Sequence, residues 1–118
     1  MKKLLKVIFI VLYILLIPYS NAYAYTMGFI LDGDTFISFA CPGAIETMPY
    51  SINDSGQIVG RCRFPNDSRI HSFLKDGDTY SYFDYPGAID TYAYSINDAG
   101  QIVGHYFDGS GGYSYLRD

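Results

Sequence analysis

After an apolar run near its N-terminus, the chain alternates short segments of aromatic and β-branched residues with polar turns rich in glycine. In the segment that begins Thr79-Tyr80-Ser81-Tyr82, polar and aromatic residues alternate with a period of two. No stretch places apolar residues at helical spacing. Short strands at regular spacing, bounded by turn residues, are typical of all-β proteins. We therefore expect an all-β fold of antiparallel strands.

The pattern repeats along the chain. The decamer SINDSGQIVG, Ser51 to Gly60, returns as SINDAGQIVG, Ser95 to Gly104. The residues before each decamer also correspond, with Asp-Gly-Asp-Thr and Pro-Gly-Ala-Ile in both copies. Self-similarity at a fixed period indicates a repeat architecture. We place the first repeat at about residues 27–70, the second at about 71–112, and the start of a third at 113–118.

Each repeat is expected to contain four strands. Asp-Gly pairs favour two-residue hairpins, and Pro-Gly pairs favour type II turns. Asn-Asp-x-Gly sequences form turns in which asparagine binds its own backbone. Gly60 and Gly104 predict a bulge or a close backbone approach. The expected strands are 28–31, 35–40, 47–53 and 57–63, and in the second repeat 72–75, 79–84, 91–97 and 101–107.

A four-stranded antiparallel unit of this length has the size of a β-propeller blade. We expect matching aromatic pairs to fill the space between stacked units. Two units and a flanking strand are incomplete as a closed propeller, which needs about four to eight blades. Assembly of several chains, a small sandwich and a truncated piece of a longer propeller all stay open. The pairs are Phe36/Tyr80, Phe39/Phe83 and Tyr50/Tyr94.

The repeat resembles the HAF-type extracellular repeats of bacterial secreted proteins. The residues that carry the resemblance are GF-x-L-DG, PGA-x-x-T and SIN-x-x-GQIVG, and it covers residues 27–118. It implies exported, propeller-like β proteins, and it supplies no catalytic motif to transfer to this chain.

The N-terminus has the pattern of a signal peptide at residues 1–24. Lys2, Lys3 and Lys6 precede the apolar run from Val7 to Ile17, and Ala22-Tyr23-Ala24 follows it. This order of basic, apolar and small residues is read by signal peptidase. We expect cleavage between Ala24 and Tyr25, because the run is shorter than the ~20 residues of a membrane-spanning helix. The remaining chain is then exported, without a stable membrane span, to the periplasm, cell surface or medium.

The residues after Ala24 carry five basic and twelve acidic side chains, a formal charge of −7. This acidic balance excludes a basic surface for nucleic acid. Cys41 and Cys62 align with Tyr85 and Tyr106, which favours buried apolar positions. The expected strand order separates the two cysteines by a third strand, about 10 Å apart, beyond the ~7 Å that a disulfide spans between Cα atoms. Whether they are free stays open.

The polar turns and titratable residues predict no metal, cofactor or catalytic site. The Asp and Asn turns lack the spacing of an EF-hand loop, so we interpret them as structural. His71 and His105 are not equivalent in the repeat, and no motif supplies either with an orienting partner. Glu46 and Asp90 are equivalent acids, but a glycosidase pair must face each other across about 5–10 Å.

The second repeat is rich in tyrosine, a residue that is enriched at recognition surfaces and also favoured in strands. If the chain binds a glycan or another protein, we expect Tyr80, Tyr82 and Tyr92 to take part. We expect a secreted, non-catalytic interaction or structural module with exposed sheet edges that self-associate. The alternatives are an extracellular enzyme that acts on polysaccharide and a truncated protein without a function of its own.

Overall fold

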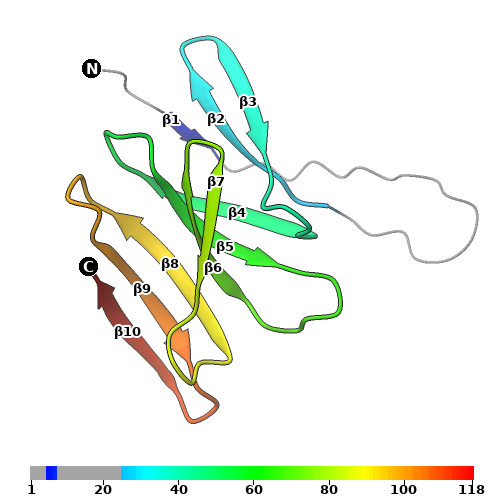
Figure 1. Ribbon diagram of the computed structural model, residues 1–118, viewed down its shortest axis with the longest axis vertical. Coiled ribbons are helices and arrows are strands. Elements are labelled where there is room, and N and C mark those ends of the chain that lie inside the picture. The colour runs from blue at the N-terminus through cyan, green and yellow to red at the C-terminus, as the bar shows by residue number, and fades with distance from the viewer. Residues whose placement is uncertain (1–4, 8–24) are drawn as a thin grey trace, which may run out of the picture.

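The computed structural model describes residues 5–7 and 25–118, which form antiparallel strands in three sheets (Figure 1). The predicted all-β fold is confirmed, and the sheets do not close into a ring. Within the described part of the chain, no helix is long and apolar enough to cross a membrane. The predicted signal peptide and its cleavage site at Ala24 lie outside the described residues, apart from residues 5–7 and Tyr25.

The eight strands expected in the two repeats are present, with bounds that agree to within one residue; β10 lies in the start of the third copy, and β1 was not expected. Their bounds are β1 (Leu5–Val7), β2 (Gly28–Asp32), β3 (Thr35–Phe39), β4 (Glu46–Ile52), β5 (Ile58–Arg63), β6 (His71–Asp76), β7 (Thr79–Phe83), β8 (Asp90–Ile96), β9 (Ile102–Phe107) and β10 (Gly112–Arg117).

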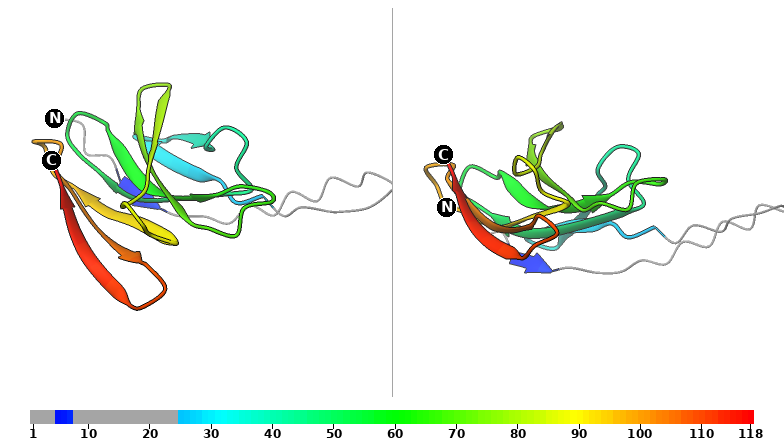
Figure 2. Two further views of the ribbon diagram at one scale, coloured as in Figure 1. Left: turned by 60° about the horizontal axis from the view of Figure 1, so that its bottom comes forward. Right: turned by 90° about the horizontal axis from the view of Figure 1, so that it is seen from below.

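The sheets are out of phase with the sequence repeat by half a repeat. The central sheet has the order β4-β5-β6-β7, so its first two strands come from the first repeat and its last two from the second. The first sheet, β1-β2-β3, holds the strands equivalent to β6 and β7, and the third sheet, β8-β9-β10, holds those equivalent to β4, β5 and β6. Figures 1 and 2 show the three sheets as successive units. In the described part of the chain, only the central sheet has all four strands.

β1 occupies the place beside β2 that β5 occupies beside β6. Leu5 pairs with Leu31 and Val7 with Phe29, while Ile58 pairs with Lys75 and Gly60 with Phe73. Because Leu31 and Lys75 are equivalent in the repeat, the two pairings have the same register. The N-terminal segment therefore takes the position of the second strand of a unit.

The turns form as their residues predict. Ala44 N donates to Cys41 O across Pro42-Gly43 (3.0 Å), and Gly43 has a φ of 77°. This is the type II turn, in which glycine supplies the positive φ. The Pro-Gly turn of the second repeat is the same: Ala88 N donates to Tyr85 O (3.0 Å).

The close approach predicted at Gly60 and Gly104 is confirmed, and its cause is a bulge on the neighbouring strand. The β4–β5 register shifts between Pro49 and Ser51, directly opposite Gly60. A Cβ atom on Gly60 would overlap the Met48 carbonyl oxygen, and one on Gly104 would overlap that of Tyr92. Each bulge leaves one extra residue, Tyr50 in β4 and its repeat equivalent in β8.

Two apolar cores join the sheets. The first lies between the β2–β3 hairpin and the central sheet and contains Phe39 and Phe73. The second lies between the central and third sheets and contains Val59 and Ile102. Adjacent Ile58 and Val59 face opposite cores, as expected for a strand buried on both faces.

The expected packing of aromatic pairs is correct only in part. Phe39 is buried, and Tyr80 packs against Phe73 with ring centroids 6.3 Å apart. Phe36, however, is 67% exposed, so its predicted place between sheets is wrong. Its face of β3 has no further sheet beside it among the described residues.

Candidate functional site

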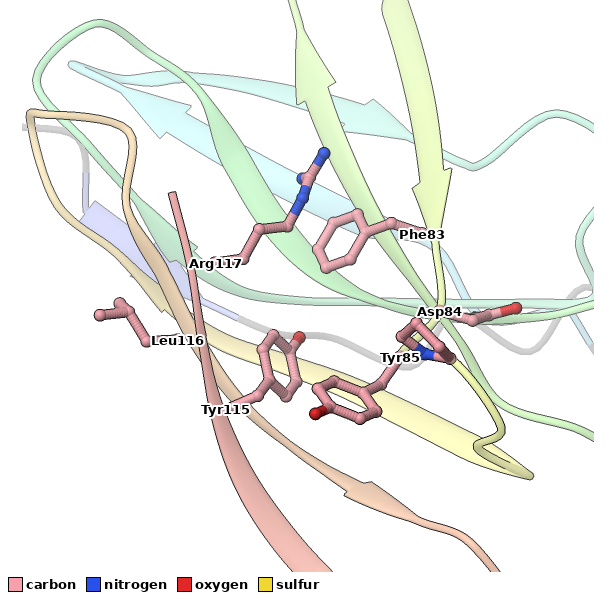
Figure 3. Close-up of a pocket in the computed structure, with 7 residues that line it drawn as sticks. Phe83, Asp84, Tyr85, Tyr115, Leu116 and Arg117 are labelled. Atoms are coloured by element: carbon pink, nitrogen blue, oxygen red, sulfur yellow. The ribbon is translucent and has the colours of Figure 1, made fainter.

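The second interface between sheets contains an aromatic pocket of about 250 Å³. Its walls come from the end of β7, the turn that follows, and β10 (Figure 3). The Arg117 guanidinium lies over the Phe83 ring, 4.4 Å from its centroid, and the Leu116 side chain projects to the other face of β10. The lining residues are Phe83, Asp84, Tyr85, Pro86, Tyr115, Leu116 and Arg117.

The equivalent space at the first interface is filled. There, Lys75 lies over the Phe39 ring at 5.7 Å, as Arg117 lies over Phe83. β7 then covers this interface: Lys75 is also 5.6 Å from the ring centroid of Tyr80. Burial, followed by the nearby Cys41, raises the pKa of Tyr80 to about 12. The pocket exists at the second interface because, among the strands that the structure describes, none equivalent to β7 lies beside β10.

The two strands at the ends of the array expose the largest apolar surfaces. Phe36 on β3 is 67% exposed and Leu116 on β10 is 63% exposed, and Ile37 beside Phe36 is 50% exposed. β3 pairs only with β2, and β10 pairs only with β9, among the described strands. Each strand therefore presents an unpaired edge next to exposed apolar side chains.

The three tyrosines predicted to take part in binding, Tyr80, Tyr82 and Tyr92, lie in two separate places. Tyr80 and Tyr82 lie on β7, and Tyr82 meets Phe64 edge to face at 5.3 Å. Tyr92 lies on β8 in a separate cluster. Its ring is 5.9 Å from that of Tyr94, and Arg61 lies 5.9 Å above it. Tyr50 and Tyr94 are the extra residues of the two bulges, and their ring centroids lie 5.3 Å apart.

His71 is held between two carboxylates. Its Nδ1 lies 2.8 Å from Asp84 Oδ2, and its Nε2 lies 3.0 Å from Asp67 Oδ2. Burial by itself would lower the pKa of His71, but the hydrogen bonds to Asp84 and Asp67 outweigh it, so the pKa is raised. These partners were not predictable from the sequence, because they lie in two loops. With both ring nitrogens engaged, His71 links those loops and has no nitrogen left for substrate.

The other candidate catalytic residues have their own partners. Glu46 pairs with Arg61 at 2.7 Å and with Arg63 at 3.5 Å. Asp90 Oδ1 accepts a hydrogen bond from Ile70 N (2.7 Å). His105 packs on the Phe107 ring with centroids 4.9 Å apart. The contacts of these residues lead to different strands and loops, not to a common cleft.

The strand order expected around the two cysteines is wrong. Cys41 follows β3 in the first sheet and Cys62 lies on β5 in the central sheet, and both belong to the first core. They are free thiols buried in the same apolar cluster. The error arose because strands of one repeat were placed in one sheet, whereas the sheets combine halves of successive repeats.

No cluster of metal-ligating side chains occurs in residues 5–7 and 25–118. No protein-family model matches the chain, and no curated protein or solved structure matches it. The site with the clearest chemistry is therefore the pair of open edges with the adjoining pocket. The short copy from Tyr113 to Asp118 was the signal in the sequence that a further strand, β10, follows the second repeat.

Proposed function

We propose that this chain is an exported, non-catalytic β-repeat protein that acts as an extracellular structural or interaction module by assembling head to tail. In this assembly, β3 of one copy adds to β10 of the next. The observation that carries the proposal is that the two most exposed large apolar side chains, Phe36 and Leu116, lie on edge strands of the first and third sheets. Exposed apolar edges are sites at which strands from other chains pair.

The repeat itself identifies which strand fits β10. β10 is equivalent to β6, whose outer partner is β7, and β3 is the equivalent of β7 in the first repeat. In the central sheet, Leu74 pairs with Ser81 and Lys75 with Tyr80. The β3 edge that corresponds to this β7 edge already pairs with β2, with Ile37 opposite Ile30. The contact between two copies therefore uses the other edge of β3, and with the same residues opposite each other Leu116 faces Ile37 of the second copy. Both side chains are at least half exposed in one chain, so the pairing removes apolar surface from water.

The same register provides an occupant for the pocket. It places Phe36 of the second copy beside Arg117, as Tyr80 lies beside Lys75 at the first interface. The aromatic pocket is then covered as the equivalent space already is within one chain. Because the contact joins two different surfaces, it is heterologous, and repeated contacts produce a ring or a filament.

Export adds a second open edge. Removal of residues 1–24 takes β1 away from β2. The position that opens beside β2 is equivalent to that of β5 beside β6, so it requires a strand equivalent to β5. The equivalent strand of the third sheet, β9, is already paired on both sides by β8 and β10. The edge of β3 therefore fits the β10 edge without displacing any pair.

The solution mass of the exported protein tests the proposal. The full 118-residue chain is produced in an exporting bacterial host, and its mass is measured by light scattering on a sizing column at several concentrations. Discrete oligomers are expected. A monomer at all concentrations contradicts the assembly, and retention of residues 1–24 in the product contradicts the proposed export.

Two matched double variants test the register. Ile37→Glu with Leu116→Lys places opposite charges across the proposed contact, while Ile37→Lys with Leu116→Lys places like charges there. We expect the first variant to assemble and the second to be monomeric. Ile89→Lys is the control, because Ile89 is as exposed as Ile37, at 50%, but lies outside the strands. Equal association of the two double variants contradicts the register.

The contacts around the titratable groups support a role without catalysis. His71 has both ring nitrogens engaged, and Glu46 and Asp90 are bound to separate partners. An enzyme that acts on polysaccharide needs two carboxylates facing one substrate. Hydrolysis of polysaccharides by the purified protein, lost on Glu46→Gln, would contradict this part of the proposal.

A second candidate function is glycan binding at Tyr92 and Tyr94, whose rings are close to parallel at 16° beside Arg61. Sugar rings pack on exposed aromatic faces, and Tyr also offers a hydroxyl group. Titration with soluble oligosaccharides, followed by NMR, should shift signals of Tyr92, and the Tyr92→Ala variant should lose the shifts. Signals that do not move exclude this function for the sugars used.

A further inference from the structure

Cys41 and Cys62 meet in the first core although 20 residues separate them in the chain. They are 1% and 0% exposed, and each is the largest influence on the pKa of the other's thiol. One threonine fixes both positions. Cys41 N donates to Thr47 Oγ1 (3.0 Å), and Thr47 lies directly opposite Cys62 in the β4–β5 register. The contact between the two cysteines therefore follows from backbone pairing.

The second repeat provides an internal comparison. Tyr85 and Tyr106 occupy the equivalent positions, and their rings stack with centroids 3.8 Å apart and planes 7° apart. Tyr85 N donates to Thr91 Oγ1 (3.0 Å), and Thr91 lies opposite Tyr106. These two positions thus touch across the interface in both repeats. In the first repeat, the residues that touch are two thiols.

We infer that Cys41 and Cys62 are a redox pair that closes to an intramolecular disulfide and joins the first hairpin covalently to the central sheet. The oxidant is a disulfide, either glutathione disulfide or the catalytic disulfide of a thiol oxidoreductase. The buried thiols react with it while the chain folds, or when the interface opens locally. The two cysteines are the only ones in the chain, so no other internal pairing competes.

The reaction has two exchange steps. The Cys41 thiolate attacks one sulfur of the oxidant, a mixed disulfide forms, and the other oxidant sulfur leaves as a thiolate. Cys62 then loses its proton, and its sulfur attacks the Cys41 sulfur and releases the second thiolate. The protein loses two S–H hydrogens and gains one S–S bond, and the oxidant is reduced to two thiols.

The surroundings favour Cys41 as the attacking group. The hydrogen bond from Cys62 lowers the pKa of the Cys41 thiol, and the Thr47 hydroxyl contributes, although burial opposes them. The same contact and burial raise the pKa of Cys62. A low thiol pKa increases the fraction of thiolate, which is the nucleophile.

The cross-link stabilises the part of the chain that needs it most. When residues 1–24 are removed, the first sheet keeps only β2 and β3, and a hairpin of two strands is marginally stable in water. The disulfide ties the end of β3 to β5 and closes a loop of the unfolded chain between residues 41 and 62. It thereby holds β3 against the core while the outer edge of β3 stays open.

A thiol count tests the inference directly. The full chain is produced with export and purified without reductant. It is then incubated with glutathione disulfide, unfolded, and treated with iodoacetamide before its mass is measured. We expect no alkylated cysteine, two after prior reduction, and a loss of two hydrogens in the untreated monomer. Two alkylated cysteines in the oxidised sample, or a disulfide only between chains, would overturn the inference. The thiol count does not depend on assembly or export.

Thermal unfolding measures the structural effect. We expect reductant to lower the Tm of the wild type by about 15 °C, the magnitude for a disulfide that closes a loop of this length. The Cys41→Ser variant is the control and should show no dependence on reductant. If this variant does not fold, Cys62→Ser replaces it, and the thiol count stands without either. An equal Tm of oxidised and reduced wild type overturns the proposed stabilisation of the hairpin.

Discussion

Asn53 donates a hydrogen bond from Nδ2 to the backbone oxygen of Asn97, its own copy in the next repeat (3.1 Å). The following residue makes a second link, from Asp54 N to Asp98 Oδ1 (2.8 Å). The Asn-Asp-x-Gly sequence therefore closes a turn within each unit and joins that turn to the equivalent turn of the next one. A repeated motif with both roles explains why the decamer is the best preserved part of the repeat.

The side chains of the two asparagines make different hydrogen bonds, which leads to a prediction for Asn53→Ala. Asn53 is buried, and its side chain binds Gln57 as well as Asn97. The substitution should lower the free energy of unfolding by about 2 kcal/mol, since it breaks turn and interface hydrogen bonds together. Urea unfolding followed by circular dichroism measures the change.

Asn97→Ala is the matched control. The exposed Asn97 side chain makes the same local bonds to Gln101 but no bond to another sheet among the described residues. Its loss should cost about 1 kcal/mol. Equal costs for the two variants would mean that the link between turns contributes nothing to stability.

The positions of strands and turns were predictable because they depend on neighbouring residues. Asp-Gly, Pro-Gly and Asn-Asp-x-Gly each specify a local backbone shape, and the structure has these turns at the expected residues. The division of strands among sheets was not predictable in this way. A repeat has no natural first residue, so the period alone does not show whether β4 pairs with strands before or after it. That ambiguity produced the error about Cys41 and Cys62.

The candidate site depends on how the strands are divided among the sheets, so it was not predictable from the sequence either. The open edge of β10 and the pocket beside Phe83 exist because the third sheet has three strands. The link from His71 to Asp67 and Asp84 joins loops that meet only in the folded chain. The burial of Phe36 was mispredicted for the same reason, because it was assigned to an interface that has no second sheet.

The layering of the sheets predicts unequal effects for two equivalent valines. Val59 is 0% exposed between the central and third sheets, while Val103 is 47% exposed on the far face of the third sheet. Val59→Ala should cost about 2 kcal/mol of unfolding free energy, because it removes buried methyl groups and leaves a cavity. Val103→Ala should cost less than about 0.5 kcal/mol, as for other exposed substitutions. Equal losses in urea unfolding would contradict the order of the sheets.

The bulge opposite Gly104 predicts a large effect of one methyl group. In Gly104→Ala, the new Cβ would overlap the Tyr92 carbonyl oxygen and the Tyr115 side chain. The backbone of a paired strand cannot shift without disturbing the neighbouring hydrogen bonds. The substitution should therefore lower the free energy of unfolding by about 3 kcal/mol. Gly111→Ala is the control, because its Cβ would meet only the Tyr113 ring at ordinary distances. A Gly104→Ala protein with the Tm of the wild type would contradict the close approach.

The position of His71 predicts that stability falls as pH rises through the neutral range. Its folded-state pKa is raised by Asp84 and Asp67 against the effect of burial, so folding favours the charged ring. The backbone amide and side chain of Arg69 hold the pKa of Asp67 well below its usual range, which keeps this partner ionised. The stabilisation is complete below the unfolded pKa of about 6.5 and is lost as pH rises through the folded value.

Urea unfolding of reduced protein between about pH 5.5 and pH 8 measures this dependence. His71→Gln should remove most of the slope, because glutamine cannot take up a proton and keeps only neutral hydrogen bonds. His105→Gln should keep the slope, since the His105 ring packs on Phe107 and has no carboxylate partner in residues 25–118. If the wild type and His71→Gln lose stability in parallel, the ion pairs of His71 do not control the pH dependence. Other titrating groups must then account for the pH dependence of the free energy of unfolding.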